Sequence, residues 1–186
     1  IPATLLTFAP GETSKPAVVT VNGDNAYEST ETFFVNLSSP VNATISDSQG
    51  LGTITNDDDI PLLSINDVTQ AEGNSGMTAL TFTVTKTGTT ELPVSVNFAT
   101  ADGTAFGNAS CGVGFDYQNQ TGMLSFAPSD LTKAITVQVC GDVVKELDDT
   151  FLVNLSSPFN AAMAAPSAWR PKAGARCFGS KPIRWC

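Results

Sequence analysis

The stretch VNGDNAYESTETFFVN, from Val21 to Asn36, occurs again without gaps as VCGDVVKELDDTFLVN, from Val139 to Asn154. The two copies lie at a constant offset of 118 residues, as from Phe33 to Phe151. In both copies a Gly-Asp pair follows an alternating apolar segment, and acidic residues follow at matching steps. Apolar and polar residues then alternate again. This period of two predicts β-strands on either side of an acidic loop.

The repeat extends well beyond this stretch, because residues 6–43 match residues 124–161. An offset of this length is near the size of an immunoglobulin-like domain. We therefore expect residues 1–59 to be the C-terminal half of one repeat. Residues 60–161 are expected to be a second repeat that lacks its last strand, and residues 162–186 an irregular basic tail.

Short alternating segments separated by turns indicate an all-β fold. Strands are predicted at residues 4–10, 15–21, 32–37, 43–45 and 50–55, and again at 62–66, 78–85, 93–100, 122–128 and 133–139. The pattern favours an immunoglobulin-like antiparallel β-sandwich with one partial and one nearly complete repeat. Because half a sandwich exposes unpaired strand edges, residues 1–59 are expected to be poorly stable or sticky on their own.

The charge of the chain is strongly uneven. It carries 18 acidic and 9 basic residues, and five of the basic ones follow Ala161. A body this acidic should repel nucleic acid and anionic membranes and should attract cations, although acidity can also serve solubility alone. The chain has no histidine, which removes the commonest general base and the commonest transition-metal ligand.

The repeat stops abruptly after Ala161, where the tail AMAAPSAWRPKAGARCFGSKPIRWC begins. This tail does not alternate, and it contains both tryptophans and two of the four cysteines. A neighbouring reading frame can encode Asp-Gly-Ser-Thr-Leu-Gly-Val over residues 162–168, which aligns in part with Asp47, Leu51 and Gly52. A frameshift is one hypothesis for the tail, and a genuine basic extension is the alternative.

The acidic candidates for a cation site are Asp24, Glu28, Glu31, Asp57, Asp58 and Asp59 in the first copy, and Glu72, Asp102, Asp116, Asp142, Glu146 and Asp149 in the second. Acidic residues recur at matching positions of the two copies. Asp24 and Glu28 correspond to Asp142 and Glu146, and Glu31 corresponds to Asp149. Oxygen ligands on loops, without thiolate or imidazole, suit calcium better than zinc or copper. The alternative is that these are solvated turn residues, because Asp and Asn favour turns. The recurrence favours a cation site.

Several motifs together resemble the Calx-β domain family: FAPGETSK, VNGD, TITNDDD, EGNSG, DGTA and DY, in that order around the repeat. The resemblance implies immunoglobulin-like sandwiches, known from sodium–calcium exchangers and from tandem arrays in large bacterial surface proteins. It also implies Ca2+ at one end of each sandwich. The implied ligands are Glu72, Asp102, Asp142, Glu146 and Asp149 in the second repeat, and Asp24, Glu28, Glu31, Asp57 and Asp58 in the first.

Neither implied ligand set is complete. The first repeat lacks the front half that would supply its Glu and its Asp-Gly-Thr, and the second lacks the terminal Asp run. The main-chain carbonyls of Ala26 and Val144 stand where calcium-binding members of the family offer a further oxygen. We therefore expect calcium binding in the parent protein, and weaker binding or none in this chain.

Two cysteines lie near the predicted site. Cys111 falls in a long loop, and Cys140 ends a strand directly before Gly141-Asp142. A disulfide between them would anchor that loop and would fit an oxidising, extracellular location, whereas the alternative is two free thiols. It would close a loop of about thirty residues and stabilise the fold by roughly 3 kcal/mol.

No constellation in the sequence indicates an enzyme, because no nucleophile is matched to a base and no Gly-x-Ser-x-Gly or phosphate-binding loop is present. We predict a calcium-binding structural or adhesive repeat of a large extracellular or cell-surface protein. Its expected partners are neighbouring repeats and other cell-surface proteins, not nucleic acid. One alternative is a calcium-sensor domain of an exchanger-like membrane protein, and another is a metal-free spacer of a secreted enzyme.

Overall fold

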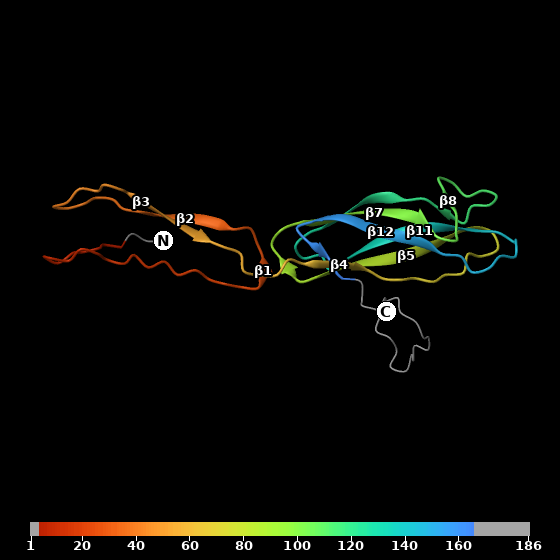
Figure 1. Ribbon diagram of the computed structural model, residues 1–186, viewed down its shortest axis with the longest axis horizontal. Helices are drawn as coiled ribbons and strands as arrows, with labels where there is room; N and C mark the ends of the chain where they lie inside the picture. The colour runs from red at the N-terminus through yellow and green to blue at the C-terminus, as the bar shows by residue number, and fades with distance from the viewer. Residues whose placement is uncertain (1–3, 166–186) are drawn as a thin grey trace, which may run out of the picture. The chain divides into compact units, whose positions relative to one another are not determined.

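The computed structural model describes residues 4–165, which form strands, turns and loops and no helix. Accordingly, no helix in this part of the chain is long and apolar enough to cross a membrane. The chain divides into two compact units, Ile1–Asp59 and Ile60–Cys186 (Figure 1). The fold is all-β, and the two units differ in how completely it is formed.

The second unit is an antiparallel sandwich of two sheets, in which β7 and β12 lie over β5 and β11 (Figure 1). One sheet has the order β13-β4-β5-β11-β9-β8 and the other the order β10-β7-β12. The strands are β4 (Leu62–Ile65), β5 (Gly76–Thr87), β6 (Thr89–Thr90), β7 (Val94–Asp102), β8 (Gly107–Asn108), β9 (Tyr117–Gln118), β10 (Thr121–Phe126), β11 (Thr132–Gly141), β12 (Phe151–Phe159) and β13 (Ala162–Met163).

The core of the second unit follows directly from the alternation in its strands. Leu80, Phe82 and Val84 of β5 are buried, whereas the intervening threonines face outward. On that outer face the hydroxyl of Thr81 lies 3.1 Å from the hydroxyl of Thr136 on β11. Inward residues of the opposite sheet and of β11 complete the same core: Val94, Val96, Phe126, Ile135 and Val137.

The first unit contains only β1 (Ala26–Tyr27), β2 (Glu31–Asn36) and β3 (Gln49–Ile54) among its described residues. Strands β2 and β3 pair antiparallel, with Phe33 opposite Gly52 and Val35 opposite Gly50. The strands predicted at residues 4–10, 15–21 and 43–45 are wrong, because these segments form turns and extended loops.

The reason lies in pairing partners. Residues 4–10 and 15–21 correspond to β10 and β11, which are held by β7 and β5 respectively. Residues 1–59 contain no counterpart of β5 or β7, so the backbone groups of these segments have no ladder to join. Phe8 shows the effect: it is 52% exposed, whereas its counterpart Phe126 is fully buried.

The expectation of an irregular segment from residue 162 onward needs one correction. Ala162 and Met163 form β13, which pairs parallel to β4 through Leu62 and Leu63. The amides of Ala162 and Ala164 donate to the carbonyls of Pro61 and Leu63, each over 2.8 Å. The predicted basic tail otherwise lies outside the described residues, apart from its first few positions.

The twin phenylalanines allow a direct test of this difference between the units. Phe126→Ala should destabilise the second unit by about 3–5 kcal/mol, because it removes a fully buried ring. Phe8→Ala should change the stability by less than about 0.5 kcal/mol, because its ring is half exposed. Urea denaturation measures both changes, with hydrogen exchange of the β5 and β11 amides reporting on the second unit and that of the β2 and β3 amides on the first. Equal effects of the two substitutions would contradict the difference between the units.

Candidate calcium site

Carboxylates from three separate loops gather at one end of the second unit. Glu72 comes from the loop before β5, Asp116 from the residue before β9, and three further acids from the loop between β11 and β12. Burial raises the pKa of Glu146, and the carboxylates of Asp142, Asp116, Glu72 and Asp149 raise it further, in that order. The sandwich therefore brings the other four acids close enough for their charges to act on Glu146, although the five are up to 77 positions apart in the sequence, from Glu72 to Asp149.

Asp142 has a structural role that explains part of its recurrence. Its Oδ1 accepts the backbone amide of Val144 over 2.7 Å. In the first unit Oδ1 of Asp24 accepts the amide of Ala26 over 2.8 Å. In both units the aspartate side chain closes a turn through its Oδ1, as expected for an aspartate that favours turns.

Asp102 occupies a different position from the other predicted ligands. Its Oδ1 accepts the hydroxyl of Tyr117 over 2.6 Å and the amide of Gly107 over 2.9 Å. The Tyr117 bond and then the Gly107 bond lower the pKa of Asp102. Burial, followed by the bond to Asp102, raises the pKa of Tyr117 to about 12. Asp102 is not among the acids that raise the pKa of Glu146, and its bond to Tyr117 fixes the end of β7 to the core. Its role as a ligand stays a prediction.

Asp116 is a candidate from the acidic residues of the second copy, although the family resemblance does not imply it as a ligand. Its carboxylate is among those that raise the pKa of Glu146. Its Oδ2 accepts the amide of Phe106 over 2.7 Å, and its carbonyl accepts the amide of Cys140 over 2.8 Å. These bonds tie the loop before β9 to the end of β11. The signal in the sequence is an acid directly before a buried tyrosine, Asp116-Tyr117.

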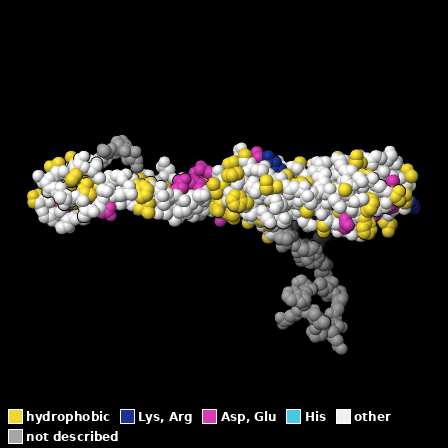
Figure 2. Space-filling model, turned by 90° about the horizontal axis from the view of Figure 1, so that it is seen from above, with side chains coloured by type: hydrophobic (Ala, Val, Ile, Leu, Met, Phe, Trp, Pro, Cys, Tyr) yellow, Lys and Arg dark blue, Asp and Glu magenta, His cyan; other side chains and the backbone are white. Residues whose placement is uncertain are grey.

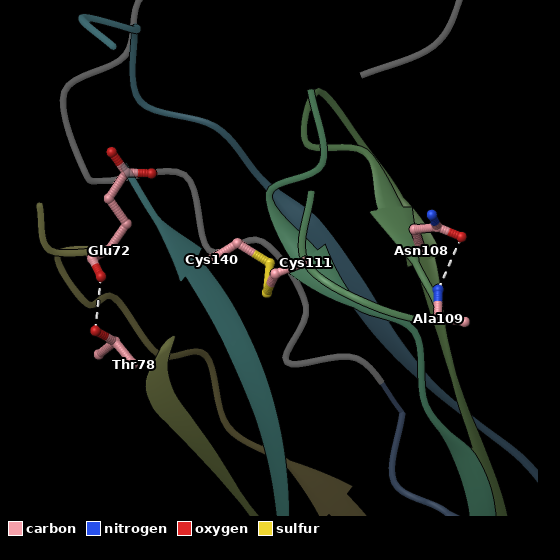
Figure 3. The surroundings of a disulfide bond; sticks show 6 residues. All are labelled: Glu72, Thr78, Asn108, Ala109, Cys111 and Cys140. Carbon is pink, nitrogen blue, oxygen red and sulfur yellow. Dashed lines mark hydrogen bonds between the residues drawn. A yellow bond between two sulfur atoms is a disulfide. The ribbon is translucent and has the colours of Figure 1, made fainter. Parts of the chain in front are cut away.

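Cys111 and Cys140 are joined by a disulfide with Cα atoms 5.6 Å apart, as Figure 3 shows. The bond attaches the long loop after β8 to the end of β11, directly before Gly141 and Asp142. A Cβ on Gly141 would lie only 2.9 Å and 2.8 Å from the carbonyl oxygens of Glu72 and Gly73. Glycine at this position thus lets β11 approach the Glu72 loop closely. The Glu72 carbonyl also accepts the Thr78 hydroxyl over 2.6 Å (Figure 3).

The acids of the first unit form a second, smaller group around a hollow of about 420 Å3, whose lining includes Asp24, Glu28, Asp57 and Asp58. Burial raises the pKa of Asp58, and the carboxylates of Asp57, Asp24 and Asp59 add to the effect. Glu31 is not among the acids that raise the pKa of Asp58, and it lies on β2 opposite Ile54.

Asn56 is a residue of this group that the sequence analysis did not identify. Its side-chain oxygen accepts the amide of Glu28 over 2.9 Å, and its side-chain nitrogen donates to the carbonyl of Asp58 over 2.9 Å. It therefore links the acidic loop to the aspartate run. The motif Thr-Asn-Asp-Asp contains the signal, but only the paired geometry of β2 and β3 reveals the contact.

Both groups offer oxygen donors on loops, which is the chemistry that calcium prefers. The chain has no histidine, and Cys111 and Cys140 are held in the disulfide, so zinc- or copper-type ligands are not available from these residues. Basic side chains are also few on the face drawn in Figure 2, and the ion pairs Glu12–Lys15 and Asp130–Lys133 lie outside the acidic group of the second unit. The residues present fit a calcium ion.

The disulfide yields a stability prediction. Replacing both Cys111 and Cys140 by serine should lower the free energy of unfolding of the second unit by about 3 kcal/mol, because it frees a loop with a sequence separation of 29 residues. Guanidinium denaturation measures the change. The unmodified protein with a thiol reductant serves as a matched control and should lose the same amount, and a loss below about 1 kcal/mol in both would contradict the prediction.

Comparison with known proteins adds an independent observation. The model of the Calx-beta domain family matches residues 2–59 and 56–173. Sodium/calcium exchanger 2 of Rattus norvegicus is 28% identical over 177 residues, and sodium/calcium exchanger 1 of the same species is 27% identical over 181 residues. These matches cover 82% and 87% of this chain, which spans only 18% of either exchanger.

Solved structures of Calx domains are also similar to the chain. The apo-form Calx CBD1 domain is 29% identical, with a TM-score of 0.41, over 47% of this chain and 74% of that one. CBD12 from CALX1.2 is 30% identical, with the same TM-score, over 47% of this chain and 34% of that one. Because the two matches to the family model together span residues 2–173, the chain belongs to the Calx-beta domain family.

Proposed function

We propose that this chain is a calcium-binding module, and that the ion is held at the acidic end of the second unit. The observation that carries the proposal is the convergence of three loops: Gly141 lies against the Glu72 carbonyl, and the Cys140 amide beside it donates to the Asp116 carbonyl. The raised pKa of Glu146 agrees with this convergence. The proposed ligands are Glu72, Asp116, Asp142, Glu146 and Asp149. Asp102 supports them from the end of β7 through Tyr117.

In this arrangement, bound calcium would hold the acidic loops in one conformation. Carboxylates on separate loops repel one another and favour their separation. A bound calcium ion supplies the positive charge that offsets this repulsion. Asp142 is already held by its turn, and Asp116 by the bond to Phe106, so these two residues form the fixed side of the site. Glu146 and Asp149 lie on the longer loop between β11 and β12 and form its adaptable side.

Within a larger protein, such a module would act as a regulatory calcium sensor. The similarity to two sodium/calcium exchangers supports this role over the adhesive one predicted from the sequence. Binding would stiffen one end of the sandwich, and that change would pass to whatever the loops contact. Nothing in the site requires catalysis, so no enzymatic activity is proposed.

A structural repeat of an extracellular or cell-surface protein is the second candidate. The Cys111–Cys140 disulfide favours it, because disulfides persist mainly in oxidising compartments. In that role the contacts would be with neighbouring repeats and with other surface proteins. Protease accessibility of the full-length protein on intact cells distinguishes the two: digestion from outside supports the surface repeat, and protection supports the internal sensor.

Calcium titration tests the binding itself. The melting temperature of the full chain should rise with calcium, by an amount equivalent to about 2.7 kcal/mol at a hundredfold excess over Kd. The double variant Asp142→Ala, Glu146→Ala should abolish the heat of binding and the shift. Asp148→Asn is the matched control, because Asp148 lies in the same loop but is not among the acids acting on Glu146. If the unmodified chain shows neither heat nor shift, the metal-free spacer is the correct function.

The charge of Glu146 predicts opposite effects with and without calcium. Because neighbouring acids destabilise its ionised form, Glu146→Gln should raise the melting temperature of the metal-free protein. The same change should reduce the calcium-induced shift, since it removes a ligand. Scanning calorimetry in EDTA and in calcium measures both. A lower melting temperature in EDTA would contradict the proposed repulsion.

The raised pKa of Glu146 also sets a direction for pH dependence. In the metal-free protein the folded state binds more protons than the unfolded state just above the ordinary glutamate pKa, so this contribution to stability falls as pH rises through that window. Protons compete with calcium for the same carboxylate, and the calcium-induced shift should therefore shrink from about pH 7 to about pH 5. Melting curves at both pH values measure it, and a shift independent of pH would contradict the role of Glu146.

A further inference from the structure

Strand β12 is an edge strand in the described part of the second unit. Its sheet has the order β10-β7-β12, so β12 pairs with β7 on one side and with no described strand on the other, which is called the open edge below. The first unit shows what belongs on the other side. Strand β2 matches the start of β12 at the offset of 118 residues, and β2 pairs antiparallel with β3. The internal repeat thus provides a template for the open edge.

The register of the template can be transferred residue by residue. Phe33 stands opposite Gly52 and Val35 opposite Gly50, so Phe151 and Val153 would each face a glycine. The amide of Leu37 donates to the carbonyl of Ser48 over 2.8 Å. Because outward amides alternate along an antiparallel strand, the amides of Phe151, Val153 and Leu155 are expected to point toward the open side.

The core beside this edge is incompletely covered. Phe151, Val153 and Leu155 pack against the core but are only partly buried. Leu152 and Phe159, on the outer face of the same strand, are 56% and 63% exposed. Unpaired backbone groups next to partly exposed apolar side chains are the features that favour addition of a strand.

The glycines of β3 suit this position. The ring of Phe33 lies over Gly52 so closely that a Cβ at that residue would collide with it. A strand therefore fits beside β2 when a glycine lies opposite the phenylalanine, whereas the side chain of a larger residue would collide with the phenylalanine ring. Phe151, the counterpart of Phe33, stacks on Tyr117 with ring centroids 4.3 Å apart.

The balance of partners favours transfer of β3 to β12. In the first unit β3 pairs only with β2, and a two-stranded sheet is marginally stable in water. On β12 the same strand would join a sheet that is backed by a formed core. We propose that the open edge of β12 binds the β3 strand, Gln49–Ile54, of a second copy of this chain.

A synthetic peptide of residues 47–56 tests the acceptor edge on the intact full chain. It contains β3 but not Asp57–Asp59, and the assay is run in EDTA, so its outcome is independent of the calcium proposal. Saturable binding by calorimetry is expected, with hydrogen exchange slowed roughly tenfold at the amides of Phe151–Leu155. A peptide with Gly52→Pro should not bind, because it places a ring where a small residue and a donor are needed. A peptide with Leu51→Ala should still bind.

Self-association tests the second copy as the occupant. Sedimentation of the full chain should show a concentration-dependent dimer or larger species, and excess peptide should dissociate it. Failure of the peptide to bind, equal binding of the Gly52→Pro peptide, or protection appearing on β2 rather than β12 would overturn the proposal. A monomer at every concentration would overturn the second copy as its occupant.

Discussion

Backbone pairing with β5 and β7 is the constraint on which the rest of the molecule depends. β5 pairs with β4 and β11, and β7 pairs with β10 and β12. With those two strands present, the second half of a repeat forms a sandwich with a closed core. Without counterparts of them, residues 4–22, which repeat the apolar pattern of residues 122–140, form no strand. The two units are therefore a natural comparison of one sequence pattern with and without its pairing partners.

The acidic site is a consequence of this pairing. The ten-residue ladder between β5 and β11 brings Gly141 beside the Glu72 loop, and the single pairing of Val139 with Tyr117 brings Asp116 to the same place. Like charges are thus concentrated by a framework that has already been stabilised elsewhere, by apolar burial. The turn at Asp142 forms in both units, because it depends only on local contacts. The nearness of Glu146 to four other acids depends on the pairing of β11 with β5 and β9, and the charges of those acids raise the pKa of Glu146.

Much of the second unit could be predicted from the sequence, because alternation fixes which residues face inward. Leu80, Phe82 and Val84 follow this rule, and so does Lys86, whose buried ammonium donates to the carbonyls of Ala127 and Pro128. The recurrence of Asp24 and Asp142 likewise points to the acidic loop. The strands predicted at residues 4–10 and 15–21 do not form, because alternation indicates that a segment favours a strand but does not show whether a neighbouring strand is present to pair with it. Asp116 is a candidate because of its charge, but its contacts with Phe106 and Cys140 could not be predicted, and neither could those of Asn56, because they join loops that are distant in sequence.

The parallel pairing of β13 with β4 has a mechanical consequence. The chain enters the second unit at β4, and its described part leaves through β13 beside it, with two backbone bonds between Pro61–Leu63 and Ala162–Ala164. Tension applied to the two ends of the unit would pull these strands in opposite directions along their length. Bonds between parallel strands loaded in this way share the force, whereas those of a hairpin pulled from its open end break one after another. The short β4–β13 pairing would therefore bear such a load along both of its backbone bonds at once.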